Sequence, residues 1–160
     1  PTADWAAIIS SPLQRCAAFA RQLAETRQRP LQLETDLQEL AFGDWEGCSP
    51  AEVAARQPEW LERFWHDPWQ TPPPAGERLQ HFEARILAVL QRLLHQPDRQ
   101  APLLVITHGG VIRLLLARAR GLERTALLQV DVPHAARFRL VLDQSPAGHL
   151  QLQELPCLPC

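Results

Sequence analysis

The sequence predicts an α/β fold in which a parallel sheet is covered by helices. Two observations lead to this prediction. Short, apolar and partly β-branched runs at 5–10, 31–34 and 102–106 are typical of buried strands in a parallel sheet. The first and the third of these runs are each followed directly by apolar residues at helical spacing, which is the order of a βα unit.

Composition limits the classes of protein to which the chain could belong. At 160 residues with 46% hydrophobic residues, one domain spanning 1–160 is the natural expectation. The net charge of −2 and the scattered basic residues argue against a nucleic acid partner. The sequence shows no long uncharged apolar run and no secretory signal, so we expect a cytoplasmic protein that does not bind membranes.

Four cysteines are present, and two of them form a Cys-x-x-Cys pair near the C-terminus. Cys157 and Cys160 could be a redox pair or half of a zinc site. No second such pair and no histidine cluster completes a set of four ligands. We therefore expect reduced thiols and no bound metal.

The N-terminal third predicts a βαβ unit. After the strand at 5–10, Ser11 and Gln14 fit a capping box, and Pro12 suits the first position of a helix. This helix should end before Pro30, and 31–34 is the second strand.

An irregular loop at 37–47 follows, rich in acidic and aromatic residues and containing two glycines. Ser49 and Glu52 form a second capping-box pattern, which predicts a short helix before a segment rich in tryptophan and phenylalanine. Prolines cluster at 67–76, which predicts an extended, stiff surface flap. The apolar spacing at 77–95 predicts one long amphipathic helix.

The strand at 102–106 leads through a His-Gly-Gly run into another helix. Beyond that helix, 125–130 could form a short helix or a turn. Alternating apolar residues at 136–142 and 149–155, separated by a Pro-Ala-Gly turn, predict a terminal hairpin.

Three separated residues are candidates for chemistry on an anion. Arg15 lies in the first turn predicted for a helix that follows a strand, Glu39 lies in the irregular loop, and His108 ends a buried strand. The positive end of a helix dipole beside His108 and Gly109 favours phosphate, and glycine lets an anion approach the backbone closely. Taken alone, His108 could equally cap a turn, and Arg15 and Glu39 could be solvated side chains.

Together these motifs resemble the histidine phosphatase superfamily, also called the phosphoglycerate mutase-like family. The resemblance rests on Ser-Ser-Pro-Leu-Gln-Arg at 10–15, Phe-Gly-Asp-Trp-Glu-Gly at 42–47 and Thr-His-Gly-Gly at 107–110. It covers nearly the whole chain. Within the superfamily, the second motif, the tryptophan-rich segment and Gly76-Glu77 are most similar to the α-ribazole phosphatases of cobalamin biosynthesis.

The resemblance implies a three-layer fold with a mostly parallel central sheet flanked by helices. It also implies a phosphomonoesterase that hydrolyses α-ribazole 5′-phosphate, or a similar small ester, through a phosphohistidine intermediate. Arg15, His108 and Gly109 would bind the phosphoryl group, and Glu39 would be the general acid. No metal or other cofactor is required by this chemistry. Another small-molecule phosphatase or a phosphoglycerate mutase of the same superfamily is an alternative.

The sequence departs from the family pattern at the nucleophile. An Arg-His-Gly motif, expected tens of residues before the Ser-Pro-Leu-x-Arg motif, does not occur, and the chain begins at Pro1 without any methionine. We expect an N-terminal strand carrying that motif to precede Pro1 in the natural protein, since a sheet without it has unpaired edges. A non-catalytic phosphate-binding or scaffold protein is the alternative.

Two smaller questions remain at the level of sequence. Arg78 stands where many relatives have serine, so a charge could replace a hydrogen bond near the substrate, or it could face solvent. Four tryptophans could line the leaving-group side or pack under the flap; they are Trp45, Trp60, Trp65 and Trp69. A homo-oligomer is possible.

Overall fold

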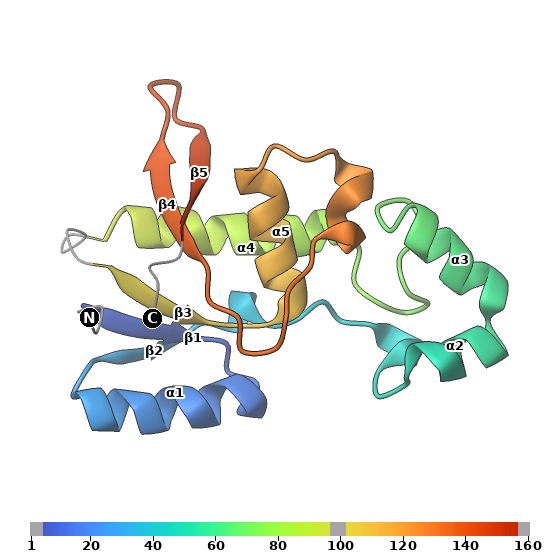
Figure 1. Cartoon of the computed structure of the whole chain (residues 1–160), viewed down its shortest axis with the longest axis horizontal. Helices are drawn as coiled ribbons and strands as arrows, with labels where there is room; N and C mark the ends of the chain where they lie inside the picture. The colour runs from blue at the N-terminus through green and yellow to red at the C-terminus, as the bar shows by residue number, and fades with distance from the viewer. Residues whose placement is uncertain (1–4, 97–101, 157–160) are drawn as a thin grey trace.

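A computed structural model describes residues 5–96 and 102–156 of the chain. Its centre is a parallel three-stranded sheet made of β1 (Ala7–Ser10), β2 (Leu31–Leu33) and β3 (Leu103–Ile106), in the order β2-β1-β3. Helices lie on both faces of the sheet (Figure 1). The predicted α/β fold with a parallel sheet is confirmed.

One face of the sheet is covered by α1 (Gln14–Arg27). Its alanines at 17, 20 and 24 are buried, and small side chains allow the helix to lie close to the fully buried Ile8 of β1. The predicted capping box is wrong: Leu13 is the N-cap residue, and no side chain caps the helix. The hydroxyl of Ser11 is instead bound within the candidate site described below.

The opposite face is covered by α4 (Leu79–Leu94) and α5 (Gly109–Ala119). The helix predicted at 77–95 is confirmed, because α4 buries its apolar stripe in the main core as the spacing requires. The largest fully buried side chains of this core include Ile9, Leu37, Phe82, Ile86, Leu114 and Leu116.

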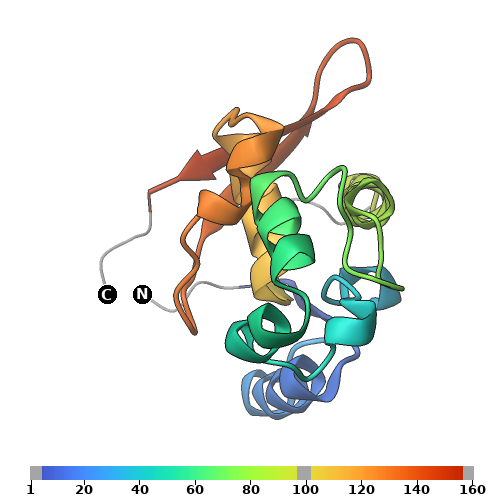
Figure 2. The same ribbon diagram turned by 90° about the vertical axis from the view of Figure 1, so that its right-hand side faces the viewer.

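After β2 the chain passes through two 3-10 turns, η1 (Thr35–Leu37) and η2 (Gly43–Trp45), into two short helices. These helices, α2 (Pro50–Arg56) and α3 (Pro58–His66), form a unit at one end of the molecule with a small core of its own (Figures 1 and 2). The capping box that opens α2 is present: Ser49 Oγ accepts from Glu52 N, and the Glu52 carboxylate accepts from Ser49 N.

The proline-rich segment at 67–76 is not the extended surface flap that its composition predicts. The side chain of Asp67 accepts hydrogen bonds from the backbone N–H groups of Trp69 and Gln70, which folds the segment into a turn. Pro68 and Pro73 are fully buried. The Asp67 hydrogen bonds and the burial of two prolines therefore determine the conformation of this segment, and the stiffness of proline alone does not.

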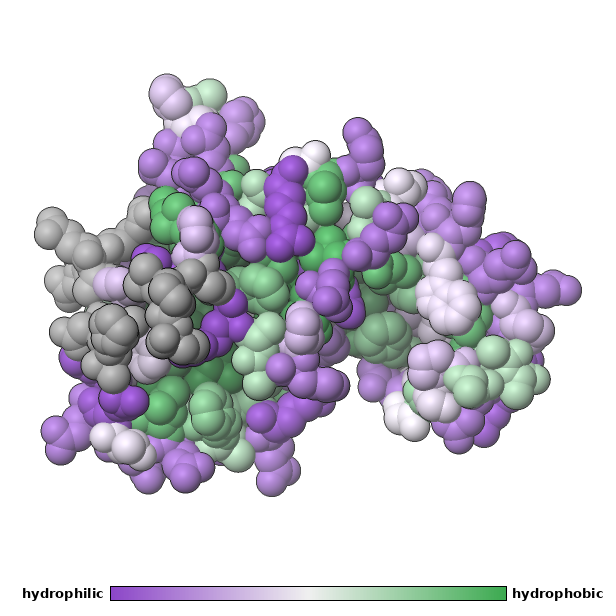
Figure 3. All heavy atoms as spheres, viewed as in Figure 1, coloured by the Kyte–Doolittle hydropathy of each residue, from purple (hydrophilic) through white to green (hydrophobic). Residues whose placement is uncertain are grey.

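The C-terminal part begins with η3 (Arg124–Gln129), followed by the antiparallel hairpin of β4 (Arg139–Gln144) and β5 (Leu150–Leu155). The predicted hairpin is confirmed, and it forms a separate two-stranded sheet. Figure 3 shows hydrophobic residues gathered toward the centre of one face, with mostly hydrophilic residues around them. Within 5–96 and 102–156, none of the helices is both long and apolar enough to cross a membrane.

Candidate active site

The motifs at 10–15 and 107–110 meet at the carboxyl end of the sheet. β1 and β3 are parallel neighbours, and Ser10 is paired with Ile106, so the segments that leave the two strands start side by side. His108 lies two residues after the end of β3 and is the N-cap residue of α5. Its side chain does not cap the helix, and the residue is only 5% exposed.

Both ring nitrogens of His108 have polar partners. Arg15 Nε donates to His108 Nδ1 at 3.1 Å, and Ser11 Oγ lies 2.7 Å from Nε2. Because a guanidinium can only donate, Nδ1 must accept, and the neutral ring therefore carries its proton on Nε2 and donates it to Ser11. Ser11 also accepts from Leu13 N, at 3.3 Å.

His108 is a neutral imidazole at neutral pH. Burial of the ring, and then the positive charges of Arg15 and Arg85, lower the pKa of His108 from 6.5 to about 4. The positively charged Arg15 guanidinium therefore lies beside an uncharged His108 ring. A dianionic ligand would instead favour the protonated, positively charged form of His108.

This low pKa predicts a pH-dependent contribution to stability. As the pH falls below 6.5 the unfolded chain binds a proton at residue 108, whereas the folded chain does not until about pH 4. We therefore expect the free energy of unfolding to decrease across that range, and to decrease less in the His108→Gln variant. Urea unfolding of both proteins at several pH values measures the difference. Equal slopes for the two proteins would contradict the assigned protonation state.

Cys16 adds a buried thiol to the site. Its Sγ lies 3.7 Å from each ring nitrogen of His108 and 3.5 Å from the carbonyl oxygen of Thr107. Burial is the main cause of a raised pKa for this thiol, which keeps it protonated at neutral pH. No sequence pattern predicts Cys16 at this site, apart from its position next to Arg15.

Glu39 comes to the same place from the loop after β2. Its Oε2 accepts from Gly110 N at 3.1 Å and its Oε1 accepts from Leu40 N at 3.0 Å. A carboxylate is stabilised at the N-terminus of α5 by the free N–H groups and the helix dipole. A Cβ atom at position 110 would overlap Glu39 Oε1, so glycine is needed for this approach. The structure therefore brings Arg15, Glu39 and His108 together.

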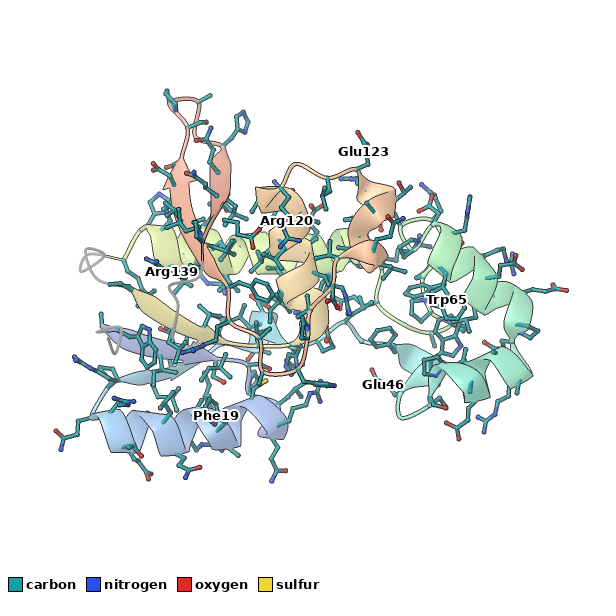
Figure 4. All side chains as sticks on the ribbon, in the orientation of Figure 1. Phe19, Glu46, Trp65, Arg120, Glu123 and Arg139 are labelled. Atoms are coloured by element: carbon teal, nitrogen blue, oxygen red, sulfur yellow. The ribbon has the colours of Figure 1, made fainter. Side chains whose placement is uncertain are left out.

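The four tryptophans differ in their surroundings. Trp45 and Trp69 are buried, and their indole N–H groups donate to Gln57 Oε1 and to the carbonyl oxygen of Arg124. Trp60 donates to the carbonyl oxygen of Pro72. Trp65 is 56% exposed on α3 (Figure 4). Packing thus accounts for the two buried side chains, and Trp65 is the most exposed of the four.

Among the described residues, no group of three or more His, Cys, Asp or Glu side chains could hold a metal ion. Cys157 and Cys160 lie outside the described residues. Arg78 is the N-cap residue of α4, and its side chain does not cap that helix.

Comparison with known proteins shows the family to which the chain is similar. Residues 1–153 match the family described as histidine phosphatase superfamily (branch 1). The chain is 33% identical over 137 residues to the adenosylcobalamin/alpha-ribazole phosphatase of Escherichia coli, covering 86% of this chain and 67% of that protein. It is 31% identical over 121 residues to the glucosyl-3-phosphoglycerate phosphatase of Mycolicibacterium vanbaalenii, covering 72% and 53%.

A solved structure supports the same relationship. The crystal structure of the alpha-ribazole phosphatase from Shigella flexneri superposes with a TM-score of 0.72 at 26% identity, covering 96% of this chain and 74% of that one. The chain matches only part of the length of these relatives. It spans 35% of some curated relatives and 67% of the Escherichia coli protein.

Proposed function

Because the chain belongs to the histidine phosphatase superfamily (branch 1), we propose that it hydrolyses a small phosphate monoester, α-ribazole 5′-phosphate or a similar ester, through a phosphohistidine intermediate. The observation that carries this proposal is the convergence of Arg15, Glu39 and His108 at the N-terminus of α5. These residues come from three separate segments, and they supply a cation, a carboxylate and an imidazole around one helix dipole. Such a set suits a phosphoryl group bound beside a group that can transfer a proton.

In this proposal Arg15 and His108 bind the phosphoryl oxygens. The Arg15 guanidinium now donates to His108 Nδ1 and would turn part of its donor set toward the ligand. His108 becomes an imidazolium beside the dianion, and both groups strengthen their hydrogen bonds as charge shifts in the transition state. Gly109 begins α5 and would present its backbone N–H at the positive end of the helix.

Glu39 would move the protons of the reaction. Protonated in the complex with substrate, it gives its proton to the leaving alkoxide as the P–O bond breaks. As a carboxylate it later takes a proton from the water that attacks the phosphohistidine. A nearby dianionic phosphate favours the protonated form that the first step needs.

The phosphohistidine step also needs a nucleophilic imidazole, and residues 1–160 contain no Arg-His-Gly motif. The proposal places that motif on an additional strand along the edge of β3 that is unpaired within the described residues. Two observations support this place: β3 is an edge strand of the sheet within the described residues, and its Val105 is 38% exposed. A strand running parallel to β3 there would end beside His108.

Assay of the natural gene product against a panel of phosphate esters tests the substrate class. We expect kcat/KM for α-ribazole 5′-phosphate to exceed that for glucosyl-3-phosphoglycerate and for 3-phosphoglycerate by about tenfold or more, because leaving-group contacts discriminate between esters. A preference for either of the other esters would reject the narrow assignment but keep a phosphatase. No hydrolysis of any ester, together with binding of phosphate, would favour the non-catalytic alternative.

A further inference from the structure

The backbone of the loop that carries Glu39 is held by two side chains from distant elements. The carbonyl groups of four consecutive residues, 36–39, all accept hydrogen bonds. Thr107 Oγ1 donates to Leu37 O at 2.8 Å, and Arg85 of α4 donates to the other three carbonyls at 2.5, 2.8 and 3.0 Å. Arg85 therefore determines where most of this short stretch lies.

The guanidinium of Arg85 is fully used. Besides the three carbonyl groups, Nε donates to Glu77 Oε1 at 2.8 Å and Nη2 donates to Glu77 Oε2 at 2.9 Å, so its five N–H groups have five acceptors. The two side chains are only 20% and 17% exposed, and the Arg85 guanidinium lies over the Phe82 ring at 4.7 Å. A lysine has one nitrogen and three donors and could not reproduce this fork.

Glu77 also binds the loop on the C-terminal side of Glu39. Glu77 N donates to Ala41 O at 2.8 Å, and Ala41 N donates to Glu77 Oε2 at 3.4 Å. Glu77 thus orients Arg85 and binds the loop two residues beyond Glu39, so that the loop is held before, at and after this residue.

We propose that Arg85, oriented by Glu77, is a positioning residue that holds the Glu39 carboxylate against the N-terminus of α5. One guanidinium nitrogen binds the Glu39 carbonyl at 3.0 Å, and the carboxylate of the same residue reaches Gly110 N at 3.1 Å. Arg85 need not touch substrate, because it acts through the backbone of Glu39. The catalytic consequence rests on the proposed function, whereas the positioning itself does not.

The positioning is tested without any activity by the amide resonance of Gly110 in the isotope-labelled natural protein. Glu39→Gln removes the charge that this amide now binds and should shift its signal. We expect Arg85→Lys, and independently Glu77→Gln, to shift the same signal in the same direction. An unchanged Gly110 signal in folded Arg85→Lys and Glu77→Gln proteins would overturn the proposal. Two independent variants are used in case one of them does not fold. Thermal unfolding shows whether each variant is folded.

Kinetics then tests whether this positioning matters for the proposed reaction. Displacement of a catalytic group by about 1 Å can cost about 100-fold, so we expect Arg85→Lys to reduce kcat for an alkyl phosphate about 10- to 100-fold with KM little changed. If Arg85 acts through Glu39, adding Arg85→Lys to Glu39→Gln should cause little further loss. If kcat of the double variant instead fell by the product of the two single losses, the proposal would be overturned. A wild-type protein without phosphatase activity would reject the proposed function instead, and the Gly110 signal would still decide the positioning.

Arg92 provides a matched control on the same helix. It is also an arginine of α4 and also contacts this part of the chain, but its contacts are with the carboxylates of Asp36 and Glu34, at 3.0 and 2.9 Å. Arg85, in contrast, binds the backbone carbonyl groups of this stretch. Arg92→Lys should leave the Gly110 signal and kcat unchanged. An effect as large as that of Arg85→Lys would show that replacing either arginine of α4 disturbs the site, which would contradict a specific role for Arg85.

Discussion

Replacement of His108 by glutamine is expected to reduce phosphatase turnover about 100- to 1,000-fold, the usual cost of removing one preorganised donor to a charged transition state. Glutamine can keep a hydrogen bond to Ser11 or Arg15, but it cannot become a cation. The buried position of His108 between these two residues leaves water little access to replace it. Steady-state kinetics of the natural gene product with its best ester measures the loss.

His81→Gln is the control for this prediction. His81 is exposed on α4, so its replacement should leave turnover unchanged. Near-normal turnover of a folded His108→Gln protein would contradict the role proposed for this histidine, whatever the substrate proves to be.

Replacement of Glu39 by glutamine is expected to slow hydrolysis of an alkyl phosphate about 100- to 10,000-fold, the usual contribution of general acid–base catalysis. Glutamine has one oxygen where the carboxylate has two, so it can accept from Gly110 N or from Leu40 N but not from both. The loop should still stay in place, because Arg85 and Thr107 hold its backbone. A nitrophenyl ester, whose leaving group needs no proton, should suffer a much smaller loss in the phosphorylation step. The ratio of the two losses measures proton donation by Glu39.

Glu46→Gln is the matched control in the same loop. Glu46 accepts from Phe42 N at 2.7 Å and is exposed, so the variant tests the loss of one loop carboxylate away from α5. We expect little change with either ester. Equal losses of the Glu39→Gln protein on both esters would mean that Glu39 holds the site together without transferring a proton to the leaving group.

Much of the fold follows from local sequence patterns. The helix α4 and the capping box at Ser49 depend on residues within a few positions of one another, and both are present as predicted. The parallel arrangement of β1 and β2 around α1 follows from the short strands and the helical segment between them. In these cases burial on the sheet and local preference favour the same structure.

The departures depend on partners far away in sequence. Ser11 has the pattern of a helix cap, but its hydroxyl is bound to His108, 97 residues later. Arg85 has the appearance of a polar residue on an amphipathic helix, yet it binds three carbonyl groups more than 45 residues earlier. Such contacts exist only after the elements pack, so periodicity and capping rules cannot reveal them.

Two of the three candidate residues were identifiable because each stands at a recognisable junction. Arg15 follows a strand and a Ser-Pro-Leu run, and His108 lies between a strand and a helix that begins with two glycines. Glu39 carries no such local signal, because its loop has no periodicity and its place depends on Arg85 and Thr107. Resemblance to a family identified it, and the packing of α4 against the loop explains it.

The central claim, that a phosphoryl group binds among Arg15, His108 and the N-terminus of α5, is tested most directly by calorimetric titration with inorganic phosphate. Charge-assisted hydrogen bonds contribute about 1.5 to 3 kcal/mol each, so His108→Gln should weaken phosphate binding about tenfold or more relative to wild type and to His81→Gln. The same phosphate affinity in all three proteins would contradict the claim, because the anion would then bind elsewhere.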